Sequence, residues 1–173
     1  MCRALVNAPF RPADKTNPVR LFAGSGMRPR VWRELSERFD VGVLEFYASS
    51  EVSAVLANAD GAKVGALGRP LPGSVEMVLA RYDFTSRSFV RTERGDVARS
   101  EANEPGVLLA RLDEAHPAHA ETDDPRVLTR VFGTQDRWWV TGDVLRRDDD
   151  GDHWYLGRTT DVVVRAGKLL FPR

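Results

Sequence analysis

Apolar and polar positions in the first part of the chain follow two different periods. Val19–Ala23 and Val41–Phe46 are short apolar runs, which predict strands. Between them, Gly24-Ser25-Gly26 predicts a tight turn, and Pro29–Phe39 predicts a helix that begins at a proline suited to a first turn. Apolar residues recur at a four-residue spacing along this helix: Val31, Leu35 and Phe39. The order strand, glycine turn, helix, strand predicts one βαβ unit of a mainly parallel sheet.

After Glu51 the pattern changes to short extended runs separated by turn signals such as Asp60-Gly61 and Asp150-Gly151-Asp152. The runs are Val52–Ala57, Val75–Tyr82, Ser88–Thr92, Val107–Leu112, Trp138–Thr141, His153–Leu156 and Val162–Arg165. Many short strands at close spacing indicate an antiparallel barrel or a twisted sheet. One helix is expected near Pro125–Phe132, with Asp124 as its N-cap. The predicted fold class is therefore α/β followed by β.

The two ends of the chain and one polar stretch give weaker signals. Met1–Pro12 lacks the apolar core of a signal peptide and is interpreted as the end of a helix that begins upstream. Ala4–Pro18 is punctuated by prolines and predicts a linker or loop. The polar stretch Ala115–Asp124 predicts an exposed loop. Asp161–Pro172 keeps a regular pattern almost to the last residue, so we expect further chain to follow it.

Composition narrows the function classes. The chain has 173 residues, and its 25 Lys and Arg residues balance 25 Asp and Glu residues, so the formal net charge is zero. This balance gives no electrostatic footprint for nucleic acid. Cys2 is the only cysteine, which excludes an internal disulfide and fits a reducing compartment. No run of 18 apolar residues is present, so no membrane-spanning helix is expected. A cytoplasmic location is expected, in line with the reducing compartment.

Two segments of the βαβ unit are candidates for a nucleotide site. Gly24-Ser25-Gly26 joins a strand to a helix start, where glycines allow close backbone approach and the helix favours anions. The sequence EFYASSE, Glu45 to Glu51, ends the second strand at the edge where open α/β folds bind ligands. There Tyr47 can stack on a base, Ser49 or Ser50 can donate to a phosphate oxygen, and Glu51 can hold Mg²⁺. An ordinary turn and an ordinary strand end are the alternatives.

Two further candidates lie near the end of the chain. In WVTGD, Asp143 follows Thr-Gly and can accept hydrogen bonds from two ribose hydroxyls, and a plain turn is the alternative. Arg158 can bind ribose or phosphate through its fork of donors, or can be a surface arginine. A metal site at His116, His119 or His153 is not expected, because no third ligand is evident.

The order and spacing of these motifs resemble the adenylate-forming (AMP-binding) superfamily, and within it the fatty acid transport protein and very-long-chain acyl-CoA synthetase branch. RLFAGSGMRPRVWRELSERF is similar to that branch's GNGLRPDVWEEF-type segment, and EFYASSE to its FYG-x-TE motif. VLANADGAKVGALGRP, NEPGVLLARL, WVTGD and GRTTDVVVRAGK follow in the family's order. The resemblance covers roughly Arg3 to Lys168.

The resemblance implies a role for each candidate residue. In that family a fatty acid carboxylate attacks the α-phosphate of ATP, and CoA then displaces AMP from the acyl-adenylate. Gly24, Ser25 and Gly26 would flank the adenine, and Tyr47 would stack against it. Ser50, where the family usually has Thr, would touch the α-phosphate. Glu51 would bind Mg²⁺, Asp143 the ribose hydroxyls, and Arg158 the ribose or phosphate.

The resemblance also implies a partial chain. Residues 1–60 would be the C-terminal part of the second α/β subdomain, 61–157 a distorted antiparallel β-barrel subdomain, and 158–173 the hinge and the start of a small domain. The family's phosphate loop with its Lys, and the small domain's catalytic Lys, are not found here. Ala48 and Thr160 also depart from the family's usual residues.

Three functions are consistent with these expectations. The first is a fragment of an ATP-dependent long- or very-long-chain fatty acyl-CoA synthetase that is inactive alone, with fatty acid, ATP and CoA as substrates of its parent. A complementing chain and peripheral membrane association of the parent stay open. The second is a non-catalytic protein that binds nucleotide or acyl-adenylate. The third is an interaction module that uses only the barrel. No base lies at usable spacing from Ser25, which disfavours a hydrolase.

Overall fold

The computed structural model describes residues 1–112 and 124–172, and its N-terminal part is the predicted βαβ unit. Strand β1 (Leu21–Gly24) leads through the glycine turn into helix α2 (Pro29–Phe39), which returns to strand β2 (Gly42–Ala48). Strands β1 and β2 pair in parallel, as predicted. The helix packs on the sheet because Trp32 and Leu35 are buried against Val41 and Val43. Burial of one helix face thus explains why the predicted bounds of α2 are the observed ones.

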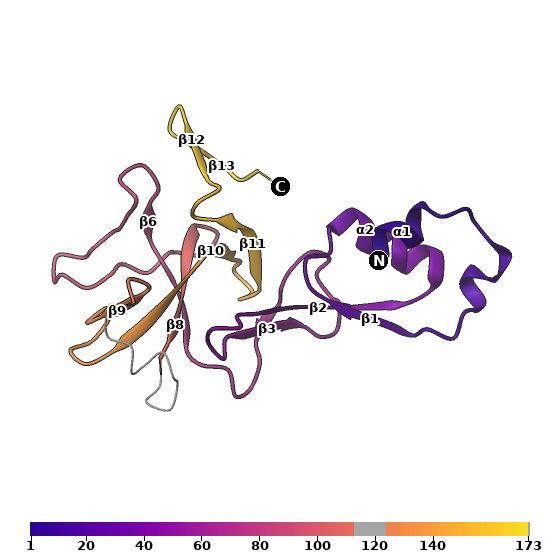
Figure 1. Cartoon of the computed structure of the whole chain (residues 1–173), viewed down its shortest axis with the longest axis horizontal. Helices are drawn as coiled ribbons and strands as arrows, with labels where there is room; N and C mark the ends of the chain where they lie inside the picture. Colours follow the sequence, from indigo (N-terminus) through magenta and orange to yellow (C-terminus); the bar gives the residue numbers. More distant parts are fainter. Residues whose placement is uncertain (113–123, 173) are drawn as a thin grey trace.

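This sheet continues with antiparallel strands. Strand β3 (Val55–Asn58) pairs with β2, and the two-residue strand β4 (Arg69–Pro70) pairs with β3, giving the order β1-β2-β3-β4. Tyr47 therefore lies opposite Leu56, and Glu45 opposite Asn58. Figure 1 shows this sheet running from the helices toward the middle of the molecule. It therefore carries the glycine turn and the EFYASSE segment toward the rest of the chain.

The N-terminal segment is more ordered than a linker, so the prediction for Ala4–Pro18 was wrong. It contains helix α1 (Cys2–Asn7) and the 3₁₀ helix η1 (Pro12–Thr16). Arg38 of α2 holds both, because its guanidinium donates to carbonyls at the end of α1, including Val6 at 3.0 Å and Ala8 at 2.7 Å, and forms an ion pair with Asp14 of η1 at 2.8 Å. These contacts join residues more than 20 positions apart, so the local proline signals could not reveal them.

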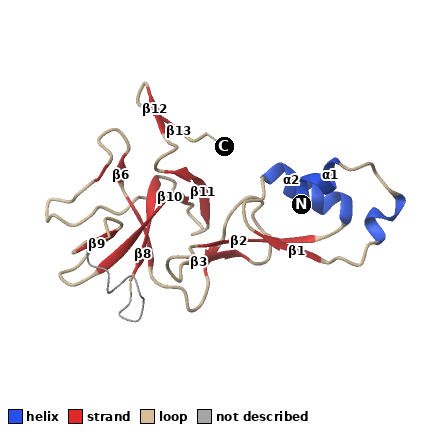
Figure 2. Ribbon diagram, viewed as in Figure 1, coloured by secondary structure: helices blue, strands red, loops and turns tan. Residues whose placement is uncertain are grey.

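The C-terminal part is built on a second, antiparallel sheet with the order β11-β10-β8-β5 (Figure 2). Its strands are β5 (Met77–Ala80), β8 (Pro105–Arg111), β10 (Arg137–Arg147) and β11 (His153–Arg158), with β9 (Val127–Thr129) paired to β10. Two small hairpins accompany it: β6 (Tyr82–Asp83) with β7 (Ser88–Phe89), and β12 (Val163–Arg165) with β13 (Lys168–Leu170). Among residues 1–112 and 124–172, strand pairing does not close this sheet into a barrel, so it is a twisted open sheet.

The helix expected near Pro125–Phe132 is absent, since residues 127–129 form β9 instead. Val127 pairs with Trp139, and the guanidinium of Arg126 lies 4.2 Å from the centre of the Trp139 ring. Asp124 does not cap a helix but accepts a hydrogen bond from the Arg126 backbone N–H at 2.8 Å. Pairing with the long strand β10 therefore overrides the local helix signal. His116, His119 and most of the predicted loop Ala115–Asp124 lie outside the described residues.

A shared apolar cluster connects the two sheets. Leu56 of β3 and Leu67 pack with Leu79, Leu108 and Leu145 of the second sheet, and all five are buried. Hydrogen bonds reinforce the junction, because the backbone N–H of His153 donates to Gly68 and that of Leu67 donates to His153, both at 2.8 Å. Strands β2 and β3 are thereby fixed beside β10 and β11. The domain limits near residues 60 and 157 stay a prediction.

Candidate functional site

Asp143 is the centre of the candidate site. It lies within the long strand β10, where the register with β8 shifts between Val140 and Val144, so the alternative of a plain turn is wrong. Gly142 has φ 76°, a conformation that glycine adopts without strain. The Thr141 hydroxyl donates to the Leu108 carbonyl and accepts from the Asp143 backbone N–H, which fixes the irregular backbone. The bulge thus aims the Asp143 carboxylate out of the regular ladder.

Both oxygens of the Asp143 carboxylate have partners, and Asp143 is only 6% exposed. The hydroxyl of Tyr47 donates to Oδ2 at 2.7 Å, and Nε of Arg158 lies 3.1 Å from Oδ1. Arg158 stands next to Asp143 because the two residues are register partners on β10 and β11. Tyr47 comes from β2, 96 positions away along the chain. The fold thus assembles three predicted site residues from three strands.

The surroundings of Asp143 alter the ionisation of its neighbours. Burial, together with the negative charge of Asp143, raises the pKa of Tyr47 far above its usual value, so its hydroxyl keeps its proton and donates. Attraction by Asp143 raises the pKa of Arg158. Burial also raises the pKa of Tyr155, which lines the same pocket. The site therefore presents an anionic carboxylate held between a neutral phenol and a cationic guanidinium.

Ser49, Ser50 and Glu51 follow strand β2 and form the polar rim of the site. The Glu51 carboxylate accepts hydrogen bonds from the Ser49 hydroxyl at 2.9 Å and the Ser50 hydroxyl at 3.1 Å. The hydrogen bond from Ser49 is the main cause of a lowered Glu51 pKa, so this carboxylate is charged at neutral pH. Among the residues that the structure describes, no group of three or more His, Cys, Asp or Glu residues is arranged to hold a metal ion.

Two adjoining pockets contain most of the predicted residues. The first, of about 280 Å³, is lined by Tyr47, Ala48, Ser49, Ser50, Glu51, Thr141, Asp143, Tyr155 and Arg158. The second, of about 360 Å³ and mainly apolar, is lined by residues that include Ser25, Gly26, Phe46, Leu67 and, in common with the first, Tyr47, Ala48 and Tyr155. Gly24 lines neither of these two and instead borders a third pocket behind the glycine turn. Tyr47, Ala48 and Tyr155 therefore border both the polar and the apolar pocket.

The glycine turn is held by Glu45, a residue that sequence reasoning did not single out. Glu45 is 2% exposed, and its carboxylate accepts hydrogen bonds from the backbone N–H groups of Gly26 and Met27. Burial raises the pKa of this carboxyl, against which the two backbone hydrogen bonds act. These N–H groups are consequently occupied within the protein. A charged residue inside the apolar run Val41–Phe46 was the only sequence signal for this role.

Comparisons with known proteins agree with this fold. No family model matches the chain. It is 32% identical over 173 residues to a medium/long-chain fatty acid–CoA ligase of Mycobacterium tuberculosis, FadD6, covering 97% of this chain and 28% of the relative. It is 31% identical over 179 residues to human long-chain fatty acid transport protein 1, with the same two coverages. An ATP-bound chimera of RpMatB and BxBclM superposes with a TM-score of 0.67 at 21% identity, over 99% of this chain and 32% of that one.

Sequence and fold thus define the class that the chain resembles: it matches part of the large domain of adenylate-forming ligases. It spans about 28% of the length of the curated relatives that it matches. Within this class, the curated relatives are fatty acid–CoA ligases and long-chain fatty acid transport proteins, so the predicted branch is confirmed. Among the described residues, no helix is long and apolar enough to cross a membrane.

Proposed function

We propose that this chain carries the adenine, ribose and magnesium part of the site of an ATP-dependent long- or very-long-chain fatty acyl-CoA synthetase. The observation that carries the proposal is the first pocket, where Tyr47, Ser50, Glu51, Asp143 and Arg158 meet although they were selected from separate motifs. The curated relatives support fatty acids as the substrate class of the parent enzyme. ATP and CoA would be its other substrates.

Asp143 suits the two neighbouring hydroxyls of a ribose. A carboxylate offers about four lone-pair positions, and Tyr47 and Arg158 each use one oxygen, which leaves each oxygen able to accept a further hydrogen bond. Adenine would then occupy the adjoining apolar pocket, with its face against the Tyr47 ring and its edge near Ser25 and Gly26. The exposed guanidinium of Arg158 would add a donor to the ribose or to a phosphate oxygen.

Glu51 fits a magnesium ion that is held mostly by water and phosphate. Its carboxylate is charged and stands at the exposed rim, beside the Ser49 and Ser50 hydroxyls. Mg²⁺ commonly uses one or two carboxylates, several waters and substrate phosphates rather than an all-protein cage. Such an ion would neutralise phosphate charge when bound, while the Ser50 hydroxyl would donate to the α-phosphate.

Calorimetry with a non-hydrolysable fatty acyl-AMP analogue tests the proposal. Wild-type chain should bind the analogue, and Asp143→Asn should weaken binding by roughly tenfold to 100-fold, because hydrogen bonds to a charged group contribute about 1.5–3 kcal/mol. Tyr82→Phe, which alters a tyrosine of the β6–β7 hairpin outside both pockets, is the matched control. No binding by well-folded wild-type chain, or equal binding by Asp143→Asn, would overturn the assignment.

Catalysis requires more than this part of the site supplies. We propose that the chain is inactive alone, because a phosphate loop and a catalytic lysine are not among its motifs. A complementing chain would have to supply them, or the chain would serve as a binding protein for nucleotide or acyl-adenylate. The binding-protein alternative would be favoured if the chain binds the acyl-AMP analogue but forms no acyl-CoA, even after a complementing large-domain segment is added. A cytoplasmic or membrane-peripheral location of the parent also stays a proposal.

A further inference from the structure

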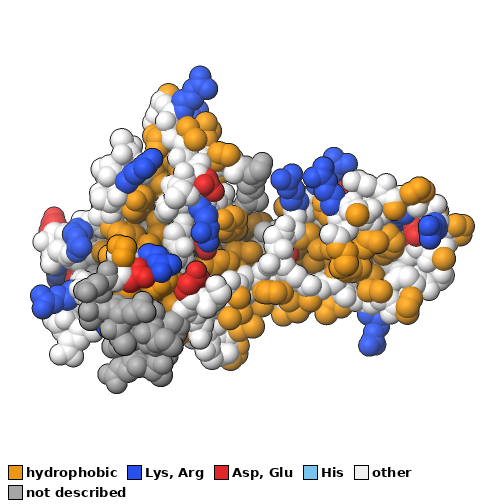
Figure 3. All heavy atoms as spheres, in the orientation of Figure 1, with side chains coloured by type: hydrophobic (Ala, Val, Ile, Leu, Met, Phe, Trp, Pro, Cys, Tyr) orange, Lys and Arg blue, Asp and Glu red, His pale blue; other side chains and the backbone are white. Residues whose placement is uncertain are grey.

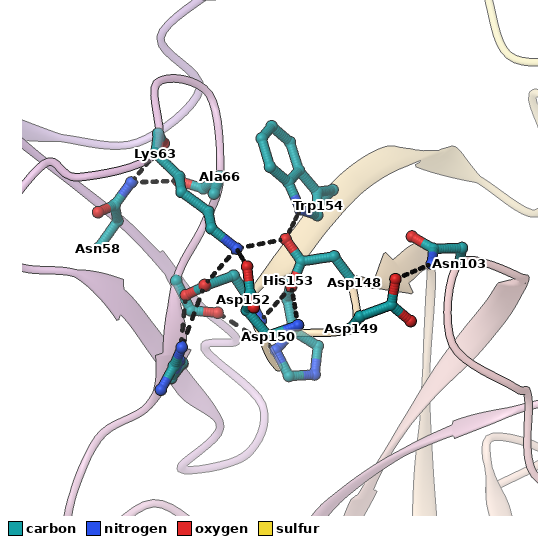
Figure 4. Close-up of polar contacts among 12 residues, drawn as sticks. Asn58, Lys63, Ala66, Asn103, Asp148, Asp149, Asp150, Asp152, His153 and Trp154 are labelled. Carbon is teal, nitrogen blue, oxygen red and sulfur yellow. Dashed lines mark hydrogen bonds and ion pairs between the residues drawn. The ribbon is translucent and has the colours of Figure 1, made fainter.

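Ion pairs connect Lys63, in the loop between β3 and β4, and Arg69 of β4 to the turn between β10 and β11. We call the five charged side chains the Lys63 clamp: Lys63, Arg69, Asp148, Asp150 and Asp152. Figure 4 shows the lysine among its three aspartates. The Lys63 ammonium lies 2.8 Å from Asp148, 2.6 Å from Asp150 and 3.0 Å from Asp152. Arg69 Nε also lies 3.3 Å from Asp152. Hydrogen bonds to Asp148 and Asp150 hold the pKa of Lys63 above its usual range, so the lysine is charged throughout the neutral range.

The lysine end of the clamp is fixed to the first sheet. Asn58, the last residue of β3, is only 5% exposed and faces Glu45 of β2. Its side-chain amide donates to the carbonyl of Lys63 at 2.7 Å and to that of Ala66 at 3.2 Å (Figure 4). The backbone of the Lys63 loop therefore cannot shift without breaking buried hydrogen bonds, which are costly to leave unmade.

The aspartate end of the clamp is fixed to the second sheet. One oxygen of Asp148 accepts from the backbone N–H groups of Asp150 at 3.1 Å and Asp152 at 2.9 Å, which shapes the turn. Its other oxygen accepts from the Trp154 indole N–H at 3.0 Å as well as from Lys63. This turn directly joins β10 to β11, so the clamp acts on the whole hairpin.

The β2–β3 hairpin and the β10–β11 hairpin also meet at the candidate site. Asp143 and Arg158 are register partners on β10 and β11, a few residues along the strands from the clamp, and Tyr47 lies on β2. Between the two meeting points, Leu56 of β3 and Leu145 of β10 are buried in one apolar cluster, against which Tyr47 and Tyr155 pack. The position of β10 relative to β2 is thus set by the clamp, the apolar cluster and the hydrogen bond from Tyr47 to Asp143.

We infer that Lys63 is a positioning residue for the nucleotide site, because its ion pairs hold the β10–β11 hairpin where Asp143 meets the Tyr47 hydroxyl. Its consequence for ligand binding rests on the proposed function, whereas the placement of Asp143 against Tyr47 does not. Geometry at such a site is demanding, since a hydrogen bond weakens steeply when its distance and angle depart from the preferred values. Lys63 contacts the aspartates of the β10–β11 turn rather than Tyr47 or Asp143, so it acts on the site through the hairpin.

Fluorine NMR of the full chain labelled with fluorotyrosine measures this placement without any ligand. The chain has three tyrosines, and Tyr82 on β6 serves as an internal reference. Asp143→Asn identifies the shift of Tyr47 when its acceptor loses its charge. We expect Lys63→Met to move the Tyr47 signal while Tyr82 stays unchanged, and Lys63→Arg to restore it. Lys168→Met, at an exposed lysine of β13, is the matched control and should change nothing.

Calorimetry with the acyl-AMP analogue adds the functional readout. Lys63→Met should raise the dissociation constant by up to roughly tenfold to 100-fold, the loss expected when the ligand's hydrogen bonds to the Asp143 carboxylate are misplaced, and Lys63→Arg should recover most of the affinity. A folded Lys63→Met variant with an unchanged Tyr47 signal overturns the inference, whatever the ligand does. If that variant does not fold, the isosteric Asp148→Asn variant decides by the same signal. Wild-type chain that binds no analogue refutes the proposed function alone, because the Tyr47 signal still reports on the clamp.

Discussion

Replacing Tyr47 by phenylalanine removes one hydroxyl from the centre of the site and keeps the ring. The hydroxyl donates to the buried Asp143 carboxylate at 2.7 Å, so the variant leaves a buried acceptor with one partner fewer. Hydrogen bonds to charged groups contribute about 1.5–3 kcal/mol net. We therefore expect Tyr47→Phe to lower the free energy of unfolding by about that amount near pH 8.

This difference should shrink in alkaline solution. Burial and the charge of Asp143 raise the pKa of Tyr47 in the folded chain, whereas the unfolded chain releases the same proton near pH 10. Because the folded state retains a proton that the unfolded state loses, the wild type loses stability as pH rises above about 10. Phenylalanine has no proton to lose. The gap between the two proteins should therefore narrow by about 1.4 kcal/mol between pH 9 and pH 11.

Urea unfolding followed by tryptophan fluorescence, at several pH values from 8 to about 11, measures both effects. Tyr82→Phe controls for the removal of a phenol remote from Asp143. Equal stability of wild type and Tyr47→Phe near pH 8 would show that the hydrogen bond to Asp143 does not contribute. A gap that stays constant up to pH 11 would show that Tyr47 ionises alike in both states.

Two further predictions concern catalysis and the junction of the sheets. The isolated chain should form no acyl-CoA from ATP, CoA and palmitate, since each missing charge-stabilising group contributes a factor of about 10² to 10³ to the rate. Acyl-CoA formed in a single clean turnover assay would refute this prediction. Gly68→Ala should lower the free energy of unfolding by at least about 3 kcal/mol in urea titrations, because φ is +84° and a Cβ would collide with the Ala57 carbonyl oxygen. Gly73→Ala, at φ +87° with open space around it, is the matched control and should lower the free energy of unfolding by only about 1 kcal/mol. Equal losses of stability in the two variants would contradict the packing argument.

Local patterns predicted some elements well. The bounds of α2 agree because Pro29 starts the helix and its apolar face repeats at helical spacing. The parallel pairing of β1 and β2 followed from the same unit. The region Pro125–Phe132 was predicted wrongly because its residues take their conformation from pairing with β10, a partner that periodicity does not reveal.

Candidate site residues were predictable as residue types, but not as contacts. Asp143 was selected for its Thr-Gly context, yet its position in a bulge of β10 depends on pairing with β8 and β11. Glu45 and Lys63 escaped sequence reasoning because their partners, the turn N–H groups and the β10–β11 turn, come from other parts of the chain. Contacts of this kind depend on how the sheets pack.

The βαβ unit, the strand-rich second part and the family resemblance were predictable from the amino-acid sequence, because these depend on short-range periodicity, turn residues and the order of motifs. Which side chains meet depends instead on how the two sheets pack. Tyr47 and Asp143 are 96 positions apart, and Lys63 and Asp148 are 85 apart. Their distances are set by the burial of Leu56, Leu108 and Leu145 between the two sheets, a packing outcome that no local pattern specifies.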